Sequence, residues 1–140
     1  MTTYDRLLNI LLIDDDDVDV MNVQRAFQKN NIANPIHVAG DGLEALEMLR
    51  SGVVPKANRL LLLDLNMPRM NGIEFLRELR ADPELKSTPV VVLTTSNEGR
   101  DKVEAYNLNV ASYLTKPVRF ADFVNLMALL NKYWVLVEWP

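Results

Sequence analysis

Carboxylates, a hydroxyl and a lysine follow the apolar runs of this chain at regular intervals. Asp14 and Asp15 come directly after the first apolar run, and Asp64 comes directly after the third. Thr94 follows the fourth run, and Lys116 lies just beyond the fifth. Three carboxylates that shared a cleft without a cation would repel one another, and the pKa of at least one would rise. One lysine and one divalent cation would balance their charge.

A site with these groups favours Mg²⁺, because carboxylate oxygens are hard ligands and Mg²⁺ keeps several waters and accepts phosphoryl oxygens. It is suited to phosphoryl transfer onto a carboxylate. The metal and the lysine neutralise the transferring group, a hydroxyl donates to it, and an aspartate attacks in line. The sequence therefore predicts a magnesium-dependent phosphoryl site.

Composition excludes several other kinds of site. The chain has 140 residues, which predicts one domain. It has no cysteine, which excludes disulfides, Cys-ligated zinc and thiol catalysis. His37 is the one histidine, which argues against a His-based zinc site or a Ser-His-Asp triad, and we assign it no role. A net charge of −4 argues against nonspecific binding to nucleic acid or to an anionic membrane. We expect a cytoplasmic protein.

Short apolar runs alternate with segments of helical periodicity along the chain. Strands are predicted at 8–13, 36–39, 60–63, 89–93 and 112–114, and a helical segment follows each one. Continuous apolar strands joined by helices are typical of a parallel sheet that is buried on both faces. Right-handed crossovers then predict a doubly wound α/β sandwich. Sites in such sheets form beyond the carboxyl ends of the strands, where the polar groups above should converge.

Asp16 or Asp17 is expected to cap the first helix.

The ordered set of motifs resembles the receiver domain of two-component response regulators. It consists of Asp14-Asp15, LLLLDLNMP at 60–68, Gly72, LTTS at 93–96 and YLTKP at 113–117. The resemblance covers about residues 8–132. It implies a flavodoxin-like (βα)5 sandwich with strand order 2-1-3-4-5.

The resemblance also implies a role for each matching residue around a metal ion. Asp64 matches the phosphoacceptor and a metal ligand, Asp15 the direct metal ligand, and Asp14 the ligand that acts through water. Asn66 matches the position whose main-chain carbonyl binds the metal. Many relatives have glutamate at the position of Asp14, and aspartate keeps the charge with a shorter reach.

Further matches surround the transferred phosphoryl group. Thr94 matches the switch hydroxyl, Thr95 the small residue beside the phosphoryl group, and Tyr113 the switch aromatic. Lys116 matches the lysine that contacts phosphate. Pro117 matches a proline after a cis peptide bond, which would aim Lys116 at the site.

The end of the chain suggests the partner. The tail YWVLVEWP and the absence of an output domain are similar to small regulators that partner bacterial phytochrome histidine kinases. The expected function is a single-domain response regulator that accepts phosphate from such a kinase and acts through protein contacts. It would be no enzyme beyond its own phosphorylation and dephosphorylation. A phosphorylation-independent dimerisation scaffold and an aspartate-nucleophile phosphatase remain alternatives. Against the phosphatase, Asn66 stands where those enzymes carry a second aspartate.

The last eight residues form a separate prediction. We expect a receiver domain at 1–132 and a C-terminal extension at 133–140, in which apolar residues alternate as in a strand. An exposed apolar strand favours association. We therefore expect a homodimer that forms through this arm, through the face made by residues 99–132, or through both. The alternative is that the arm folds back over its own domain.

Overall fold

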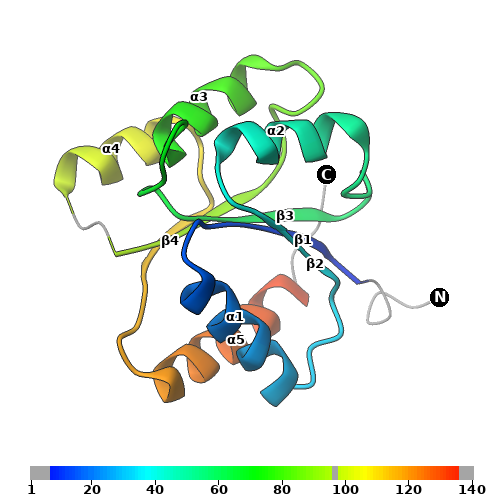
Figure 1. Cartoon of the computed structure of the whole chain (residues 1–140), viewed down its shortest axis with the longest axis vertical. Helices are drawn as coiled ribbons and strands as arrows, with labels where there is room; N and C mark the ends of the chain where they lie inside the picture. Colours follow the sequence, from blue (N-terminus) through cyan, green and yellow to red (C-terminus); the bar gives the residue numbers. More distant parts are fainter. Residues whose placement is uncertain (1–6, 96–97, 136–140) are drawn as a thin grey trace.

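The computed structural model describes residues 7–95 and 98–135, and it has a five-stranded sheet between two layers of helices (Figure 1). The strands are β1 (Asn9–Ile13), β2 (Ile36–Ala39), β3 (Arg59–Leu63), β4 (Val90–Thr94) and β5 (Ser112–Thr115). The helices are α1 (Asp17–Lys29), α2 (Gly42–Ser51), α3 (Gly72–Ala81), α4 (Gly99–Asn107) and α5 (Phe120–Val135).

The sheet has the order β2-β1-β3-β4-β5, and every pair of neighbouring strands is parallel. This confirms the predicted flavodoxin-like topology. The register pairs Ile13 with both Ala39 and Leu63, and it pairs Thr94 with Thr115. The carboxyl ends of the strands therefore lie along one edge, where the chain turns into the helices.

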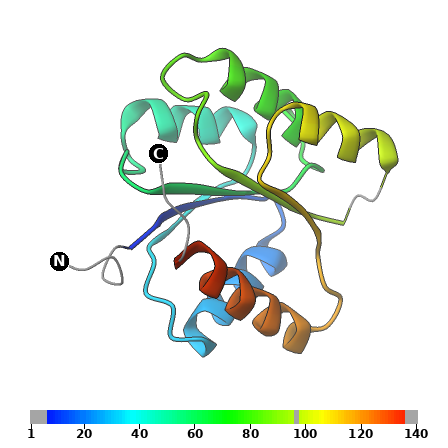
Figure 2. The same cartoon turned by 180° about the vertical axis from the view of Figure 1, so that it is seen from behind.

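Both faces of the sheet are covered. Helices α2, α3 and α4 lie over one face, and α1 and α5 lie over the other (Figure 1 and Figure 2). Alternate residues of β1 divide between the two cores: Leu11 and Ile13 pack towards α2 and α3, while Ile10 and Leu12 pack towards α1 and α5. Such two-sided burial explains why β3 is apolar from Leu60 to Leu63 and does not alternate.

Local signals begin and end several of the helices. Asp16 caps α1, because its side chain accepts hydrogen bonds from the N–H groups of Val18 and Asp19. Gly52 ends α2 in the left-handed conformation at φ 80°. Asn109 also adopts a left-handed φ of 61° just after α4.

The end of the domain differs from the prediction. Helix α5 continues to Val135, so the expected boundary between residues 132 and 133 lies inside a helix, and the strand-like interpretation is wrong for residues 133–135. Trp134 is buried at 3% exposure, and its ring lies 6.3 Å from that of Phe27 on α1. The reason is that Trp134 continues the helical spacing of Phe123 and Met127, which are buried in the same core. Residues 136–140 lie outside the described residues.

Among the described residues, no helix is long and apolar enough to cross a membrane.

Candidate functional site

The carboxyl edge of the sheet brings together the polar residues that follow its strands. Asp14 comes directly after β1 and Asp64 directly after β3, while Thr94 ends β4 and Lys116 follows β5. All four side chains are buried. The predicted convergence of carboxylates, a hydroxyl and a lysine is therefore confirmed. Parallel strands in register place the ends of distant segments side by side, which explains how Asp14 and Lys116, 102 positions apart, come into contact.

Three carboxylates form a group that fits a divalent cation. One oxygen from each of Asp14, Asp15 and Asp64 lies within 4.8 Å of the others. Asp15 is exposed, whereas Asp14 and Asp64 are buried, so the group opens to solvent on one side. Hard oxygen ligands that leave positions for water are the set that Mg²⁺ prefers. The N–H of Asn66 donates to Asp64 Oδ1 at 3.2 Å, which holds the loop after β3 close to this group.

Lys116 lies at the centre of the carboxylates. Its Nζ donates to Asp14 Oδ2 at 2.7 Å, to Asp19 Oδ2 at 2.6 Å and to Asp64 Oδ2 at 3.2 Å. Burial lowers the pKa of this ammonium, but the hydrogen bonds to Asp14 and Asp19 outweigh burial and raise the pKa above its usual value. Lys116 therefore carries a positive charge at neutral pH.

Burial has the opposite consequence for Asp14. It raises the pKa of this carboxyl from 3.8 to about 6, although the hydrogen bonds from Lys116 and from the N–H of Asp16 lower it. The negative charge of Asp64 nearby raises it further. Asp14 is therefore a carboxylate whose negative charge is incompletely compensated by the protein. A bound cation would supply what is missing.

Thr94 and Tyr113 are the two residues predicted to act as a switch. The Thr94 hydroxyl donates to Asp64 Oδ1 at 2.8 Å and accepts a bond from the N–H of Leu65 at 3.5 Å. Thr95 follows it and is exposed. Tyr113 on β5 is half-buried, and Lys102 Nζ lies 5.7 Å from the centre of its ring. The contact between Thr94 and Asp64 gives the hydroxyl direct access to any group carried by that carboxylate.

One detail of the prediction is wrong. The described residues contain no cis peptide bond, so the bond between Lys116 and Pro117 is trans. A trans bond is the more stable form even before proline. Lys116 reaches the site without the other isomer, because its N–H donates to the carbonyl of Thr94 at 2.9 Å and extends the pairing of β5 with β4.

Asp19 is the residue that the sequence prediction missed. It contacts Lys116 from the first turn of α1, and not from the end of a strand. A signal was present in the sequence: once Asp16 caps the helix, Asp19 is its third residue and lies close to the carboxyl end of β1. Asp16 and Asp17 are exposed. The acids at the start of α1 therefore differ in setting: Asp14 and Asp15 belong to the candidate cation site, Asp16 caps the helix, and Asp19 contacts Lys116.

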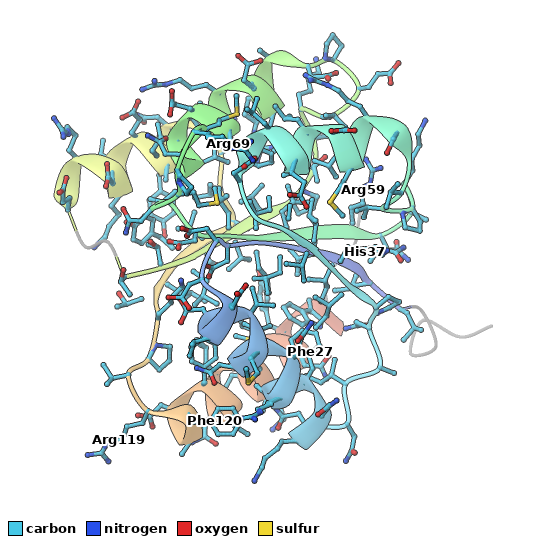
Figure 3. The ribbon with its side chains drawn as sticks, in the orientation of Figure 1. Phe27, His37, Arg59, Arg69, Arg119 and Phe120 are labelled. Atoms are coloured by element: carbon cyan, nitrogen blue, oxygen red, sulfur yellow. The ribbon has the colours of Figure 1, made fainter. Side chains whose placement is uncertain are left out.

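Two contacts hold the loop after Asp64 in place. A Cβ atom at Gly72 would lie 2.6 Å from Leu65 Cα and 2.7 Å from the carbonyl oxygen of Asp64, so glycine lets α3 approach the site closely. Arg69 forms an ion pair with Asp41, the buried residue that caps α2. Figure 3 shows Arg69 beside this helix. A hydrogen bond from Glu44 N–H and the pairing with Arg69 keep the pKa of Asp41 below its usual value.

Comparisons with known proteins agree with the fold and the site described above. A response regulator receiver domain model matches residues 10–128. The probable methanogenesis regulatory protein FilR2 of Methanothrix harundinacea is 37% identical over 128 residues, which are 90% of this chain and 83% of that protein. Response regulator Rcp1 of Synechocystis sp. is 36% identical over 129 residues, which are 90% of this chain and 88% of that protein.

Solved structures show the same likeness. The phosphorylated cyanobacterial phytochrome response regulator RcpA has a TM-score of 0.85 and 33% identity, over 96% of this chain and 99% of that one. The Mn(2+)-bound form of Rcp1 has a TM-score of 0.80 and 36% identity, over 94% of this chain and 97% of that one. The strand order, the acidic group at the carboxyl edge and these matches agree. The chain belongs to the response regulator receiver domain family.

Proposed function

We propose that this chain is a single-domain response regulator in which Asp64 accepts a phosphoryl group from a sensor histidine kinase. The observation that supports this most directly is the setting of Asp64. Its two oxygens contact the Thr94 hydroxyl at 2.8 Å and Lys116 Nζ at 3.2 Å, and one of them lies within 4.8 Å of oxygens from Asp14 and Asp15. A hydroxyl, an ammonium and two further carboxylates thus surround the Asp64 carboxylate, and this setting supports Asp64 as the nucleophile.

In the proposed reaction, an Asp64 oxygen attacks phosphorus in line, and the bond from phosphorus to the donor histidine nitrogen breaks. The product is an acyl phosphate on Asp64, which water later hydrolyses. Asp14, Asp15, Asp64 and the main-chain carbonyl of Asn66 would hold Mg²⁺, which would supply positive charge for the phosphoryl oxygens. Lys116 offers its ammonium to the same oxygens.

The switch follows from the contact that Thr94 makes. Its hydroxyl donates to Asp64 now, and it would donate to a phosphoryl oxygen once that carboxylate is modified. Movement of Thr94 vacates space beside β5, into which Tyr113 turns. The two states then present different surfaces to partners, which is how a local charge change is read at a distance.

The donor that we propose is a phytochrome-type histidine kinase, because the chain is similar to RcpA and to Rcp1 over nearly its whole length. The protein would act in the cytoplasm through protein contacts or onward phosphotransfer, without binding nucleic acid or membrane. It would not be an enzyme beyond its own phosphorylation and dephosphorylation. We also propose a homodimer, formed through residues 136–140, through the 99–132 face, or through both.

The test uses acetyl phosphate as donor. Wild-type protein, Asp64→Asn and the matched control Asp17→Asn are incubated with Mg²⁺, and their intact masses are measured. We expect a phosphoryl adduct in the wild type and in Asp17→Asn, no adduct in Asp64→Asn, and no adduct in a chelator. A wild type that stays unmodified would favour the scaffold, and continuous turnover of phosphate esters would favour the phosphatase.

Light scattering tests the dimer. Deletion of residues 136–140 leaves α5 and the buried Trp134 intact, so it removes only the proposed arm. We expect a smaller assembly after this deletion. An unchanged dimer would assign the interface to the 99–132 face, which substitution of the exposed Val103 and Tyr106 would then test. A monomeric wild type, phosphorylated or not, would contradict the proposal.

A further inference from the structure

The carboxylate of Asp19 faces the interior of the site and not solvent. Its Oδ2 accepts a hydrogen bond from Lys116 Nζ at 2.6 Å, and its side chain is only 26% exposed. Asp16 and Asp17, in the same turn of the chain, are exposed. The cap determines this orientation, because Asp16 Oδ1 accepts from the N–H of Asp19 at 3.2 Å and sets the start of α1. Asp19 is thus held by a helix, independently of the strand ends that carry the other acids.

The three acceptors of Lys116 are of two kinds. An ammonium group has three N–H donors, and here each one meets a carboxylate. Asp14 and Asp64 belong to the group whose oxygens converge for a cation, whereas Asp19 is outside that group. With a divalent cation bound, Asp14 and Asp64 share their charge with it, and the cation repels the ammonium. Asp19 is the acceptor for which the cation does not compete.

We propose that Asp19 is a positioning residue for Lys116, which keeps the ammonium at the site when a divalent cation occupies the oxygens of Asp14 and Asp64. This inference rests on the proposed phosphoacceptor function of the same site. Lysine has a flexible four-carbon stem, so an ammonium without a fixed partner would leave for water. Asp19 prevents this loss and leaves Lys116 ready for a phosphoryl oxygen.

The first part of the test reads Lys116 directly and needs no phosphorylation. Its buried ammonium exchanges protons slowly while it is hydrogen-bonded, so it should give a resolved ¹H–¹⁵N NMR signal in metal-free wild type. We expect the signal to persist at saturating Mg²⁺ in wild type and in Asp17→Asn, which removes the same charge from the same turn. We expect it to be lost in Mg²⁺-saturated Asp19→Asn. Persistence in Asp19→Asn would overturn the proposal, as would loss in the wild type or its absence without metal.

The second part measures phosphorylation by acetyl phosphate at saturating Mg²⁺. Loss of a charge-assisted hydrogen bond corresponds to about tenfold or more in rate, so we expect Asp19→Asn to be slower by about that factor. Asp17→Asn should match the wild type, and urea unfolding should show that all three proteins are folded. An equal rate in Asp19→Asn would overturn the positioning role. If the wild type is not phosphorylated at all, the proposed function fails, while the NMR signal still decides whether Asp19 holds Lys116.

Discussion

Buried cations lie at both edges of the sheet, and their partners differ. At the carboxyl edge, Lys116 is surrounded by three carboxylates. Arg59 lies at the opposite edge, where β3 begins (Figure 3). It donates to the main-chain carbonyls of Leu49 at 2.9 Å, Val54 at 2.6 Å and Pro55 at 3.0 Å. In the part of the chain that the structure describes, Arg59 forms no ion pair with a carboxylate.

This difference in partners distinguishes a cation that can exchange its partners, Lys116, from one that cannot, Arg59. Main-chain carbonyls are neutral and belong to a fixed backbone, so they bind Arg59 permanently and join the end of α2 to the start of β3. Burial lowers the pKa of this guanidinium, because its partners bring no negative charge. The carboxylates around Lys116 can instead bind another cation, and Lys116 can instead bind another anion. Exchangeable partners are what a phosphoryl site needs, and permanent partners are what a structural clamp needs.

The largest expected effect is the loss of stability when Arg59 is replaced. Arg59→Met would leave the carbonyls of Leu49, Val54 and Pro55 without their donor, and we expect it to reduce the free energy of unfolding by about 3–5 kcal/mol. Urea denaturation measures this. Arg50→Met is the matched control at the same edge, because Arg50 is exposed and pairs with Asp82 at 3.1 Å and with no other acid among the described residues, and it should cost at most about 1 kcal/mol. Similar losses for the two variants would contradict a special role for Arg59.

Lys116→Met tests the cation whose partners can exchange, and we expect a smaller loss of stability. Without metal, it leaves Asp14, Asp19 and Asp64 close together and unpaired, which should cost about 2–3 kcal/mol in unfolding free energy. Mg²⁺ should restore most of this loss, since the cation replaces the missing charge and binds only the folded site. Urea titrations with and without Mg²⁺ decide the point. If Mg²⁺ restored the stability of Arg59→Met as much as that of Lys116→Met, the distinction between the two cations would be contradicted.

The smallest effect concerns the charge of Asp14. Its pKa is raised from 3.8 to about 6 in the folded protein, so between these values the native state binds more protons than the unfolded state. Stability of the metal-free protein should therefore fall as pH rises through this window. Asp14→Asn should remove that slope and gain roughly 1–2 kcal/mol at pH 7, after allowance for solvent screening. Urea midpoints across the window measure it, and an unchanged slope would show that Asp14 is already compensated.

Much of the molecule was predictable from local patterns. Apolar runs predicted five strands, and the acids and hydroxyls directly after them predicted one shared edge. These predictions succeeded because each apolar run shows the burial of its own strand, and the alternation of strands with helices favours a parallel sheet whose carboxyl ends share one edge. Gly52 and Asn109 likewise end their helices because few other residues adopt a left-handed φ at little cost.

The failures lie where two segments meet. Trp134 reads as part of an apolar alternation, yet it is helical because Phe27 offers it a partner across the layer of α1 and α5. The bond before Pro117, expected to be cis, is trans, and Lys116 reaches the site from a backbone that pairs with Thr94 on β4. Asp19 was missed because its significance depends on a lysine that lies 97 positions away.

Residue types and their order are therefore sufficient for the fold class, the edge that carries the site and the carboxylates that form it. Periodicity, caps and strand ends are local, and parallel strands convert local order into a shared edge. The partners of each buried cation depend on packing between segments distant in sequence. Lys116 and Arg59 are both cations near strand ends, and nothing in either residue alone distinguishes them. The assembled backbone does, because it places carboxylates around one and carbonyl oxygens around the other.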